Sequence, residues 1–434
     1  MEEKVPKRIT DEITLDLPRN WESRSLNELC KIKIGGTPKT NIKSFWNGSI
    51  KWATAKDISN TSGRFIQKTE KTITKEGSDR SAAKILPANT IVITARGTVG
   101  KMAITPEPMA INQTCYGLLV ENIDNMFLYY SVKSAIEKLM GVSYGTVFDT
   151  ITIKSFENIR LLVPNNRAEQ RAIAKILSDL DSKIELNQKM NKSLESIAQD
   201  IFKHWFIDFE FPNDEGKPYK SSGGEMVDSE LGEIPKGWDV TTVGKCVDIS
   251  GGATPRTSDL RYWNGGTKYW ATPKDLSDLS SPILINTDRK ITVEGLISIG
   301  GRLFPKGSLL LSSRAPIGYL ALTDIETSVN QGIIAMLPNG KLSPFYMYGW
   351  CKANMNIIKD NANGSTFAEI SKSSFRSIKI ILPTKRVLQL YDENFSKVYA
   401  KLTNNTIQSV VLSNIRDILL PRLMSGKIRV PLEE

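Results

Sequence analysis

A long internal duplication constrains this chain more than any other feature of its sequence. The segment LPRNW, which ends at Trp21, matches IPKGW, which ends at Trp238, at an offset of 217 residues in a chain of 434. One inserted residue changes the offset to 218, and the matches then continue in the same order. We therefore expect a duplicated domain whose two copies have a pseudo-twofold relation, as in a symmetric dimer. The matching motifs include Thr37-Pro38 with Thr254-Pro255, Trp46-Asn47-Gly48 with Trp263-Asn264-Gly265, Trp52-Ala53-Thr54 with Trp270-Ala271-Thr272, and Asn112-Gln113 with Asn330-Gln331.

The first part of each half has the pattern of a mixed α/β (α+β) domain. It is rich in Gly, Pro, Trp and short β-branched or aliphatic runs. Two of these runs, Thr90–Thr94 and Ser308–Ser312, are bounded by turn residues and predict short strands. The segments Leu128–Met140 and Tyr346–Ile358 predict helices between strands.

The second part of each half changes to a heptad period, which predicts a long helix. A helix of about 38 residues is roughly 57 Å long. It cannot by itself bury the row of apolar side chains that a heptad period places along one face. We therefore expect the two long helices to pack together as an antiparallel coiled coil. The first seam consists of Ile173, Leu177, Leu180, Ile184, Asn187, Asn191, Leu194, Ala198, Ile201 and Trp205. The second consists of Tyr391, Phe395, Val398, Leu402, Asn405, Ser409, Leu412, Arg416, Leu419 and Leu423.

Polar residues interrupt both seams. Asn187 and Asn405 occupy equivalent positions, where a polar residue either fixes the register of the helices or marks a hydrated part of the seam. Arg416 also falls on the seam, and we expect the neighbouring Ile415 to supply apolar surface there.

These periods divide the chain into five segments. A polar stretch with Gly, Ser and Pro and without periodicity predicts a linker between the halves. The segments are a first globular domain (1–163), a first long helix (164–212), the linker (213–233), a second globular domain (234–383) and a second long helix (384–434).

Composition favours a soluble cytoplasmic protein with a polyanionic partner. The chain has 57 Lys and Arg against 47 Asp and Glu, a net charge of +10, and such an excess favours binding to phosphates. No apolar run approaches the roughly 18 residues of a membrane helix, and the N-terminal MEEKVPKRIT lacks a secretory pattern. The cysteines form no Cys-x-x-Cys pair, which predicts buried thiols rather than a zinc module or disulfides. They are Cys30, Cys115, Cys246 and Cys351.

Catalytic motifs are missing from the sequence. It contains no Asn-Pro-Pro-aromatic loop of adenine methyltransferases and no phosphate-binding GxxxxGK[ST] loop. The single histidine, His204, lies among aromatic residues, which favours packing over acid–base chemistry. The segment Asp214-Glu215-Gly216-Lys217 resembles elements of a metal-dependent nuclease, but its acids are contiguous in a polar stretch. We expect no catalytic residue, no metal and no cofactor in this chain.

The ordered set of motifs resembles the specificity subunits of type I restriction-modification systems. The resemblance covers nearly the whole chain, and its strength lies in the order and duplication of motifs that are each weak alone. They are the Pro-x-x-Trp opening, Gly35-Gly36-Thr37-Pro38 and Gly252-Ala253-Thr254-Pro255, the Trp-Asn-Gly pairs, Ser313-Arg314-Ala315-Pro316-Ile317-Gly318, Asn330-Gln331-Gly332, Gly364-Ser365-Thr366-Phe367, the long helices, the exit at Phe206-Ile207-Asp208-Phe209-Glu210-Phe211 and the re-entry at Gly232–Trp238.

The resemblance implies two target-recognition domains separated by two antiparallel helices, with each domain reading half of a split DNA site. It implies that two methyltransferase subunits, and possibly two motor-nuclease subunits, bind this chain. S-adenosylmethionine, ATP and Mg are then expected in those partner subunits. The chain departs from the pattern where Arg96-Gly97-Thr98 stands opposite Arg314-Ala315-Pro316, which puts equal roles for the two arginines in doubt.

Candidate functional residues follow from this reading. Asn and Gln can read adenine, but the identity of Asn112-Gln113 and Asn330-Gln331 in both halves favours structural turns, and we expect the Trp residues in the core. Base readers are expected in stretches that diverge between the halves, which are 60–70, 121–125 and 279–288. The candidate DNA-binding residues are Lys39, Lys56, Arg96, Arg256, Lys274 and Arg314. The candidate coiled-coil and partner-binding residues are Leu177, Leu180, Ile184, Leu194, Ile201, Val398, Leu402, Leu412 and Leu419.

Two other classes of function remain open at the level of the sequence. The chain could be a scaffold that joins partner subunits through its helices without reading DNA. It could also be an enzyme in its own right, which the missing motifs disfavour.

Overall fold

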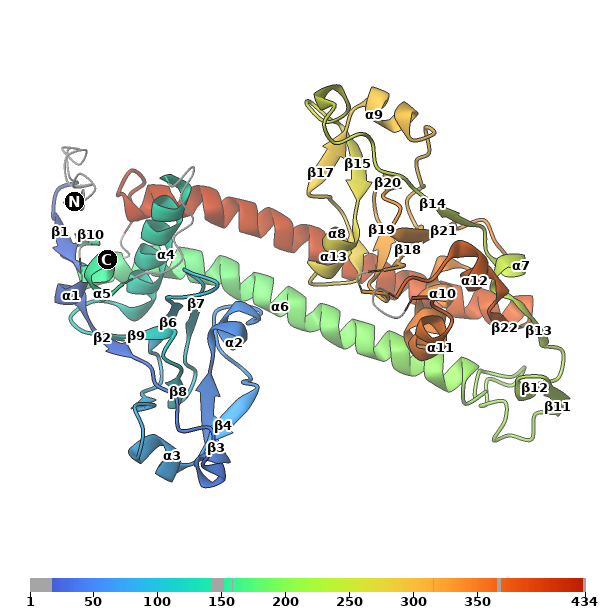
Figure 1. Ribbon diagram of the computed structural model, residues 1–434, viewed down its shortest axis with the longest axis horizontal. Helices are drawn as coiled ribbons and strands as arrows, with labels where there is room; N and C mark the ends of the chain where they lie inside the picture. Colours follow the sequence, from blue (N-terminus) through green and yellow to red (C-terminus); the bar gives the residue numbers. More distant parts are fainter. Residues whose placement is uncertain (1–17, 143–151, 158, 315, 365–367, 432–434) are drawn as a thin grey trace. The chain divides into compact units, whose positions relative to one another are not determined.

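The computed structural model describes residues 18–142, 152–157, 159–314, 316–364 and 368–431. These residues form two compact units. Unit 1 contains the residues up to Glu185 and those from Val410 onward, and unit 2 contains Leu186–Ser409. Each unit therefore combines one globular domain with a segment of each long helix (Figure 1).

The domain of unit 1 contains two four-stranded sheets. The antiparallel sheet has the order β2-β9-β6-β7, and the mixed sheet has the order β4-β3-β8-β5, in which β3 and β8 are parallel. The strands of the first are β2 (Cys30–Ile34), β6 (Ile91–Thr94), β7 (Met102–Ile104) and β9 (Cys115–Val120), and those of the second are β3 (Trp46–Ala53), β4 (Lys71–Ile73), β5 (Ile85–Leu86) and β8 (Met109–Ile111). A further pair joins β1 (Trp21–Ser25) to β10 (Arg160–Pro164), and the helices are α1 (Leu26–Leu29), η2 (Lys43–Phe45), α2 (Ala55–Ser59), α3 (Lys75–Asp79), α4 (Asn125–Val142) and α5 (Ile153–Glu157).

The domain of unit 2 repeats this plan. A five-stranded sheet has the order β14-β21-β18-β19-β16, and a three-stranded sheet has the order β17-β15-β20. The strands are β13 (Asp239–Thr242), β14 (Ile249–Gly251), β15 (Lys268–Ala271), β16 (Ile283–Leu284), β17 (Arg289–Ile291), β18 (Leu309–Ser312), β19 (Leu320–Thr323), β20 (Thr327–Val329), β21 (Ile333–Met336) and β22 (Lys379–Leu382), which pairs with β13. The helices are α7 (Val243–Cys246), η3 (Leu260–Tyr262), α8 (Pro273–Ser277), α9 (Val293–Ser298), α10 (Pro344–Ala353), α11 (Met355–Asp360) and α12 (Lys372–Ser377).

Equivalent pairings in the two domains confirm that the duplication is structural. The parallel pairing of β16 with β19 corresponds in unit 1 to the isolated parallel bridge between Phe65 and Ile104. The pairing of β5 with β8 corresponds in unit 2 to the bridge between Phe304 and Thr327. The mixed α/β class and the duplicated domain predicted from the sequence are therefore confirmed.

The predicted strands and helices form close to the expected positions. β6 and β18 lie within Thr90–Thr94 and Ser308–Ser312. Every residue of both strands is buried, because alternate residues join hydrophobic clusters on the two faces of the sheet. The segment predicted as one helix over Tyr346–Ile358 is instead two helices, α10 and α11, with Asn354 between them. Asn354 ends α10 because its backbone, at φ −109° and ψ 25°, leaves the helical conformation, and its side chain donates to the Trp350 carbonyl at 3.0 Å.

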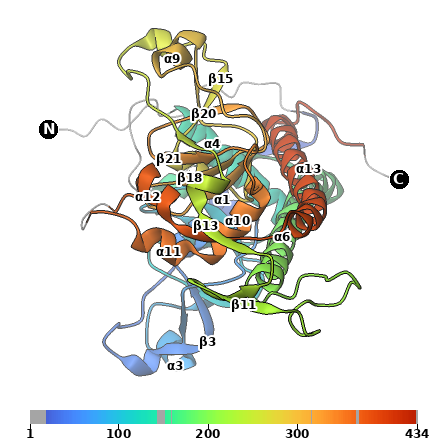
Figure 2. The same cartoon turned by 90° about the vertical axis from the view of Figure 1, so that its right-hand side faces the viewer.

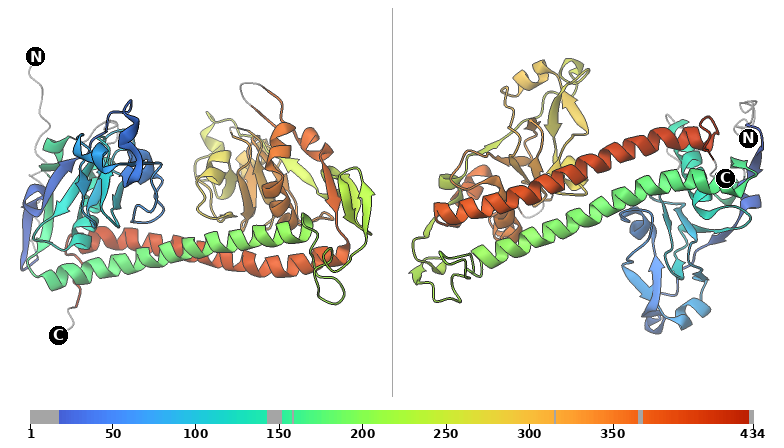
Figure 3. Two further views of the ribbon diagram at one scale, coloured as in Figure 1. Left: turned by 90° about the horizontal axis from the view of Figure 1, so that it is seen from below. Right: turned by 180° about the vertical axis from the view of Figure 1, so that it is seen from behind.

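The long helices are α6 (Arg167–Phe206) and α13 (Lys385–Met424), and their segments run antiparallel within each unit (Figure 3). In unit 1, Asp181 of α6 pairs with Arg416 of α13. In unit 2, Asn191 pairs with Asn405. The predicted antiparallel coiled coil is therefore confirmed. Buried seam residues occur in both units, and those of unit 1 are Ile173, Leu177, Ile184 and Leu423.

Two details of the helices differ from expectation. Ile415 does not supply the seam, since it is exposed, and Arg416 itself fills the position because Asp181 neutralises its charge there. His204 is exposed rather than packed, since Phe202 and Phe206 occupy the core face of α6.

The segment predicted as a linker contains regular structure. β11 (Met226–Ser229) and β12 (Gly232–Pro235) form an antiparallel pair. Ahead of them, Phe211 stacks on both Tyr219 and Trp238, so an aromatic cluster fixes the segment to the start of the second domain. This cluster is hard to detect in sequence because its members are separated by polar and glycine residues.

Candidate nucleic-acid interface

A pair of tryptophans forms the framework of the same loop in both domains. Trp46 and Trp52 meet edge to face at 5.2 Å in unit 1, and Trp263 and Trp270 do so at 5.1 Å in unit 2. Trp52 and Trp270 are buried, as predicted. The indole N–H groups hold loop backbone: Trp46 donates to the Lys39 carbonyl and Trp263 donates to that of Arg256, both at 3.2 Å.

The Asn-Gln pairs support turns in the same framework. Gln113 receives a hydrogen bond from Thr37, and Gln331 receives the equivalent bond from Thr254. The Oδ1 atom of Asn330 accepts from the backbone N–H of Gly332 at 2.9 Å. These bonds occupy the side chains and favour the structural role over adenine reading.

The tryptophans and a neighbouring helix fix the loop that leads into η2 or η3. In unit 1, Thr74 Oγ1 donates to the Ser44 carbonyl at 2.8 Å, and in unit 2, Thr292 Oγ1 donates to the Arg261 carbonyl at 2.7 Å. A glycine lies against each loop, and a Cβ on Gly295 would approach the Tyr262 carbonyl oxygen to 2.6 Å. The loops lie beside α3 and α9, at the end of each domain away from the long helices (Figure 2). We call these loops, residues 39–45 and 256–262, the framework loops.

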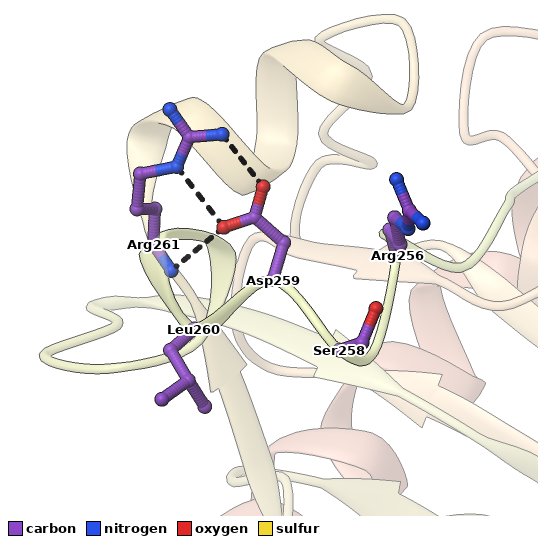
Figure 4. Close-up of a pocket in the computed structure, with 5 residues that line it drawn as sticks. All are labelled: Arg256, Ser258, Asp259, Leu260 and Arg261. Atoms are coloured by element: carbon purple, nitrogen blue, oxygen red, sulfur yellow. Dashed lines mark hydrogen bonds and ion pairs between the residues drawn. The ribbon is translucent and has the colours of Figure 1, made fainter.

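The framework loops carry two of the predicted DNA-binding residues. Lys39 and Arg256 occupy equivalent, exposed positions. Arg256 lines a shallow pocket together with Ser258, Asp259, Leu260 and Arg261 (Figure 4). The structure therefore brings Arg256 beside a second arginine that sequence reasoning did not select.

Lys56 and Lys274 also occupy equivalent places, near the start of α2 and α8. Each faces an acid that follows it in the chain: Lys56 lies 3.0 Å from Glu70, and Lys274 lies 3.7 Å from Asp288. Hydrogen bonding and Coulomb attraction from Glu70 raise the pKa of Lys56. A phosphate must therefore compete with Glu70 for this lysine.

The two arginines that the sequence aligns have different surroundings. Arg314 lies 3.6 Å from Glu369 and is about one-third exposed. Arg96 is exposed and follows β6. The six predicted DNA-binding residues thus lie on separate loops and short helices of their domains, and Lys56, Lys274 and Arg314 each have an acidic neighbour.

Two cations that the sequence did not single out are held tightly. Arg289 lies over the ring of Trp263 at 3.4 Å, the equivalent of Lys71 over Trp46 at 5.6 Å. Arg64 contacts Glu185 of α6 through its backbone N–H, Nε and Nη2, at 2.7, 2.9 and 3.1 Å. Arg64 lies in the divergent stretch 60–70, and Arg289 follows the divergent stretch 279–288. Divergence between the two halves could therefore have identified both arginines from the sequence.

The coiled-coil candidates lie on the facing sides of the long helices. Leu177 and Leu402 are almost fully buried, and Ile184 is buried. The other six, Leu180, Leu194, Ile201, Val398, Leu412 and Leu419, are partly exposed.

Asparagines form a side-chain network across the helices of unit 2. Asn187 donates to Gln408 at 2.9 Å, Asn405 donates to Asn191 at 2.9 Å, and Asn191 donates to Thr406 at 3.2 Å. Asn187 is fully buried. Direct bonds of this kind depend on alignment, so they favour the role in register over hydration.

All four cysteines are buried free thiols. Burial raises the pKa of Cys30 and of Cys115 to about 12. The described residues contain no group of three or more His, Cys, Asp or Glu side chains suited to a metal ion, and none of their helices is long and apolar enough to cross a membrane.

Comparisons with known proteins agree with this architecture. Residues 18–196 and 235–412 match the family described as "Type I restriction modification DNA specificity domain". The chain is 28% identical to the type I restriction enzyme MjaIX specificity subunit of Methanocaldococcus jannaschii over 424 residues, which cover 95% of each chain. It is 26% identical to the HindI specificity subunit of Haemophilus influenzae, over 67% of this chain and 74% of that one.

A solved structure shows the same fold. The S subunit of a type I restriction-modification system from M. genitalium matches with a TM-score of 0.56 and 17% identity, over 95% of this chain and 98% of that one. This likeness shows the fold, and the two matched domains define the class, that of proteins with two DNA specificity domains. The chain belongs to the type I restriction-modification DNA specificity family, and it is a specificity subunit.

Proposed function

We propose that this chain is the non-catalytic DNA-recognition subunit of a type I restriction-modification complex, and that it binds a split DNA site with each domain reading one half. The observation that carries the proposal is the duplicated loop framework, in which the same Trp, Thr and Gly contacts hold loops of different sequence. A constant backbone with variable side chains can read two different base sequences in the same manner. The net charge of +10 supports a polyanionic partner.

The long helices are proposed to dock two methyltransferase subunits. In unit 1, α13 exposes a row of apolar side chains, Val411, Ile415 and Ile418, with Val410 beside it. Contiguous exposed apolar surface is typical of a protein interface. S-adenosylmethionine, ATP and Mg would be bound by methyltransferase and possible motor-nuclease partners.

A genome-wide map of methylated adenines, with and without this gene, tests the proposal. Loss of one motif with two short halves around a fixed spacer supports it and reveals the sequence read. If the map is unchanged while a methyltransferase subunit still co-purifies with the chain, the chain is a scaffold that does not read DNA.

A further inference from the structure

The framework loop of unit 2 presents an arginine whose guanidinium is oriented by a carboxylate. Arg261 Nε donates to Asp259 Oδ1 at 3.0 Å, and Nη2 donates to Oδ2 at 2.7 Å (Figure 4). The backbone N–H of Arg261 also donates to Oδ1, at 3.2 Å. Arg261 has a side chain that is 74% exposed, whereas that of Asp259 is 20% exposed. An arginine has five N–H donors, which form a planar fork at the guanidinium. The bonds to Asp259 fix the orientation of this fork and leave its remaining donors facing solvent.

The backbone beneath this fork is the same in both units. The residue before η2, Ile42, has φ −97° and ψ 99°, and the residue before η3, Asp259, has φ −96° and ψ 99°. The turn bonds also correspond, since the N–H of Ile42 donates to Lys39 and that of Asp259 donates to Arg256. A rigid scaffold of this kind presents side chains at low entropic cost.

The four central side chains of the framework loop differ between the two units. Unit 1 has Asn41-Ile42-Lys43-Ser44 where unit 2 has Ser258-Asp259-Leu260-Arg261. These residues are exposed apart from Ile42 and Asp259, which are half-buried. Exposed side chains on such a backbone can change without loss of the fold, so the same loop can present different groups to DNA in the two units.

We propose that Arg261, oriented by Asp259, is a specificity-determining residue of the second domain that donates two hydrogen bonds to the O6 and N7 atoms of a guanine. The inference rests on the proposed function and names one base class in the half-site of that domain. Guanine is the base that presents two acceptors side by side in the major groove, which match the arginine fork.

The carboxylate favours a base edge over a phosphate as the partner of Arg261. Asp259 places a negative charge against the guanidinium, which weakens the attraction of the pair for a phosphate and repels its oxygens. A guanine edge is neutral and needs only oriented donors. The two lysines of the unit 1 loop, Lys39 and Lys43, have no such carboxylate in the loop and are suited to phosphate contacts.

The test uses the complex of the full chain with its methyltransferase subunits, acting on DNA libraries in which each half-site is randomised. Arg261→Ala should reduce the preference for guanine at one position of one half-site by about tenfold or more, and leave the other half unchanged. Arg261→Lys keeps the charge but not the fork, and it should relax the same position. The matched control is Arg386→Ala, which removes another exposed arginine that pairs with an aspartate, Asp214, in the same unit.

A base analogue separates recognition from structural damage. Substituting 7-deazaguanine, which lacks the N7 acceptor, at the assigned position should impair methylation by the wild-type complex and have little further effect on Arg261→Ala. Asp259→Asn should retain part of the guanine preference, since the arginine remains but is less constrained.

Three outcomes overturn the inference. In the first, wild type has a sharp split motif and Arg261→Ala leaves every position equally sharp. In the second, Arg261→Ala lowers methylation of all sequences equally and flattens the salt dependence, as expected for a phosphate contact. In the third, the wild-type complex modifies no split motif, and the proposed function fails together with the inference.

Grafting the unit 2 sequence onto the unit 1 loop provides the converse test. The variant N41S/I42D/K43L/S44R should gain a guanine preference in the other half-site. Because the backbone of the two loops is the same, failure to gain any guanine preference in a folded, DNA-binding graft would also count against the inference.

Discussion

Removing the charge of Arg416 should destabilise unit 1 much more than removing an exposed arginine. Arg416 Nη1 lies 2.6 Å from Asp181 Oδ1 in the seam, and their side chains are only 17% and 7% exposed. Burial disfavours the charged form of Arg416, but hydrogen bonds and Coulomb attraction from Asp181 outweigh it and raise the pKa of Arg416. Arg416→Met keeps most of the apolar volume and removes the charge.

The size of the effect follows from what remains around Asp181. In the variant, the carboxylate keeps one close partner, the hydroxyl of Tyr130 at 2.7 Å, and stays buried. Breaking a buried ion pair from one side costs about 3–5 kcal/mol. The exposed pair of Arg386 and Asp214, with side chains 62% and 83% exposed, should contribute at most about 1 kcal/mol.

Urea unfolding of three variants tests this reasoning. Arg416→Met should lower the midpoint strongly, and Arg386→Ala should barely change it. The double variant D181L/R416M should recover part of the loss, because it removes the unpaired charge of Asp181 but also the acceptor of the Tyr130 hydroxyl. The tryptophans of unit 1 provide a fluorescence signal for the transition. If Arg416→Met and Arg386→Ala lower the free energy of unfolding equally, the seam position is hydrated and the argument is refuted.

Three further results are expected. Burial raises the pKa of Cys30 and Cys115 to about 12, so their thiols should resist DTNB at pH 8 until urea unfolds the chain. For the same reason, the stability that the neutral thiols contribute should be complete below about pH 9 and lost as the pH rises towards 12. Gly295→Ala should cost about 1–3 kcal/mol in thermal or urea unfolding, because its Cβ would lie 2.6 Å from the Tyr262 carbonyl oxygen. Asn405→Ala should cost about 1–3 kcal/mol in the same assay, because it leaves buried polar groups of the seam unpaired; an unchanged midpoint would indicate that water replaces it.

The sequence predicted the architecture because its signals are periodic or repeated. The heptad spacing identified the seam, and the ordered motif pairs identified the duplicated domain, including framework residues such as Trp52 and Trp270. Asn112 and Asn330 were interpreted as turn residues for the same reason, since they are identical in both halves. Repetition reveals what two domains share, which is mainly their scaffold.

The candidate site was less predictable because its residues are those that the repeat does not share. The residue of unit 1 that aligns with Arg261 is Ser44, so the repeat does not point to this arginine. The orientation of its guanidinium depends on the carboxylate of Asp259, which the loop backbone places. The prediction that Ile415 supplies apolar surface in the seam was wrong, because a heptad pattern cannot show that a salt bridge stabilises Arg416 there. Both cases depend on side-chain pairing, which spacing in a single sequence does not encode.

The two domains are attached to the helix segments of their own units by unlike contacts. In unit 1 the polar contacts include the ion pair between Arg64 and Glu185, with Ser182 also bonded to Arg64 at 2.7 Å. At the equivalent place in unit 2, Ser281 and Thr406 share one neutral hydrogen bond of 2.8 Å. A charged, largely buried pair fixes direction more strictly than a rotatable hydroxyl pair. At this place the first domain is therefore held to its helix segment by charge and the second by a neutral bond, although the two domains share one plan. The second domain has its own ion pair elsewhere, between Lys352 and Glu195 at 3.0 Å, so the duplicated domains use charged contacts at different positions on their helix segments.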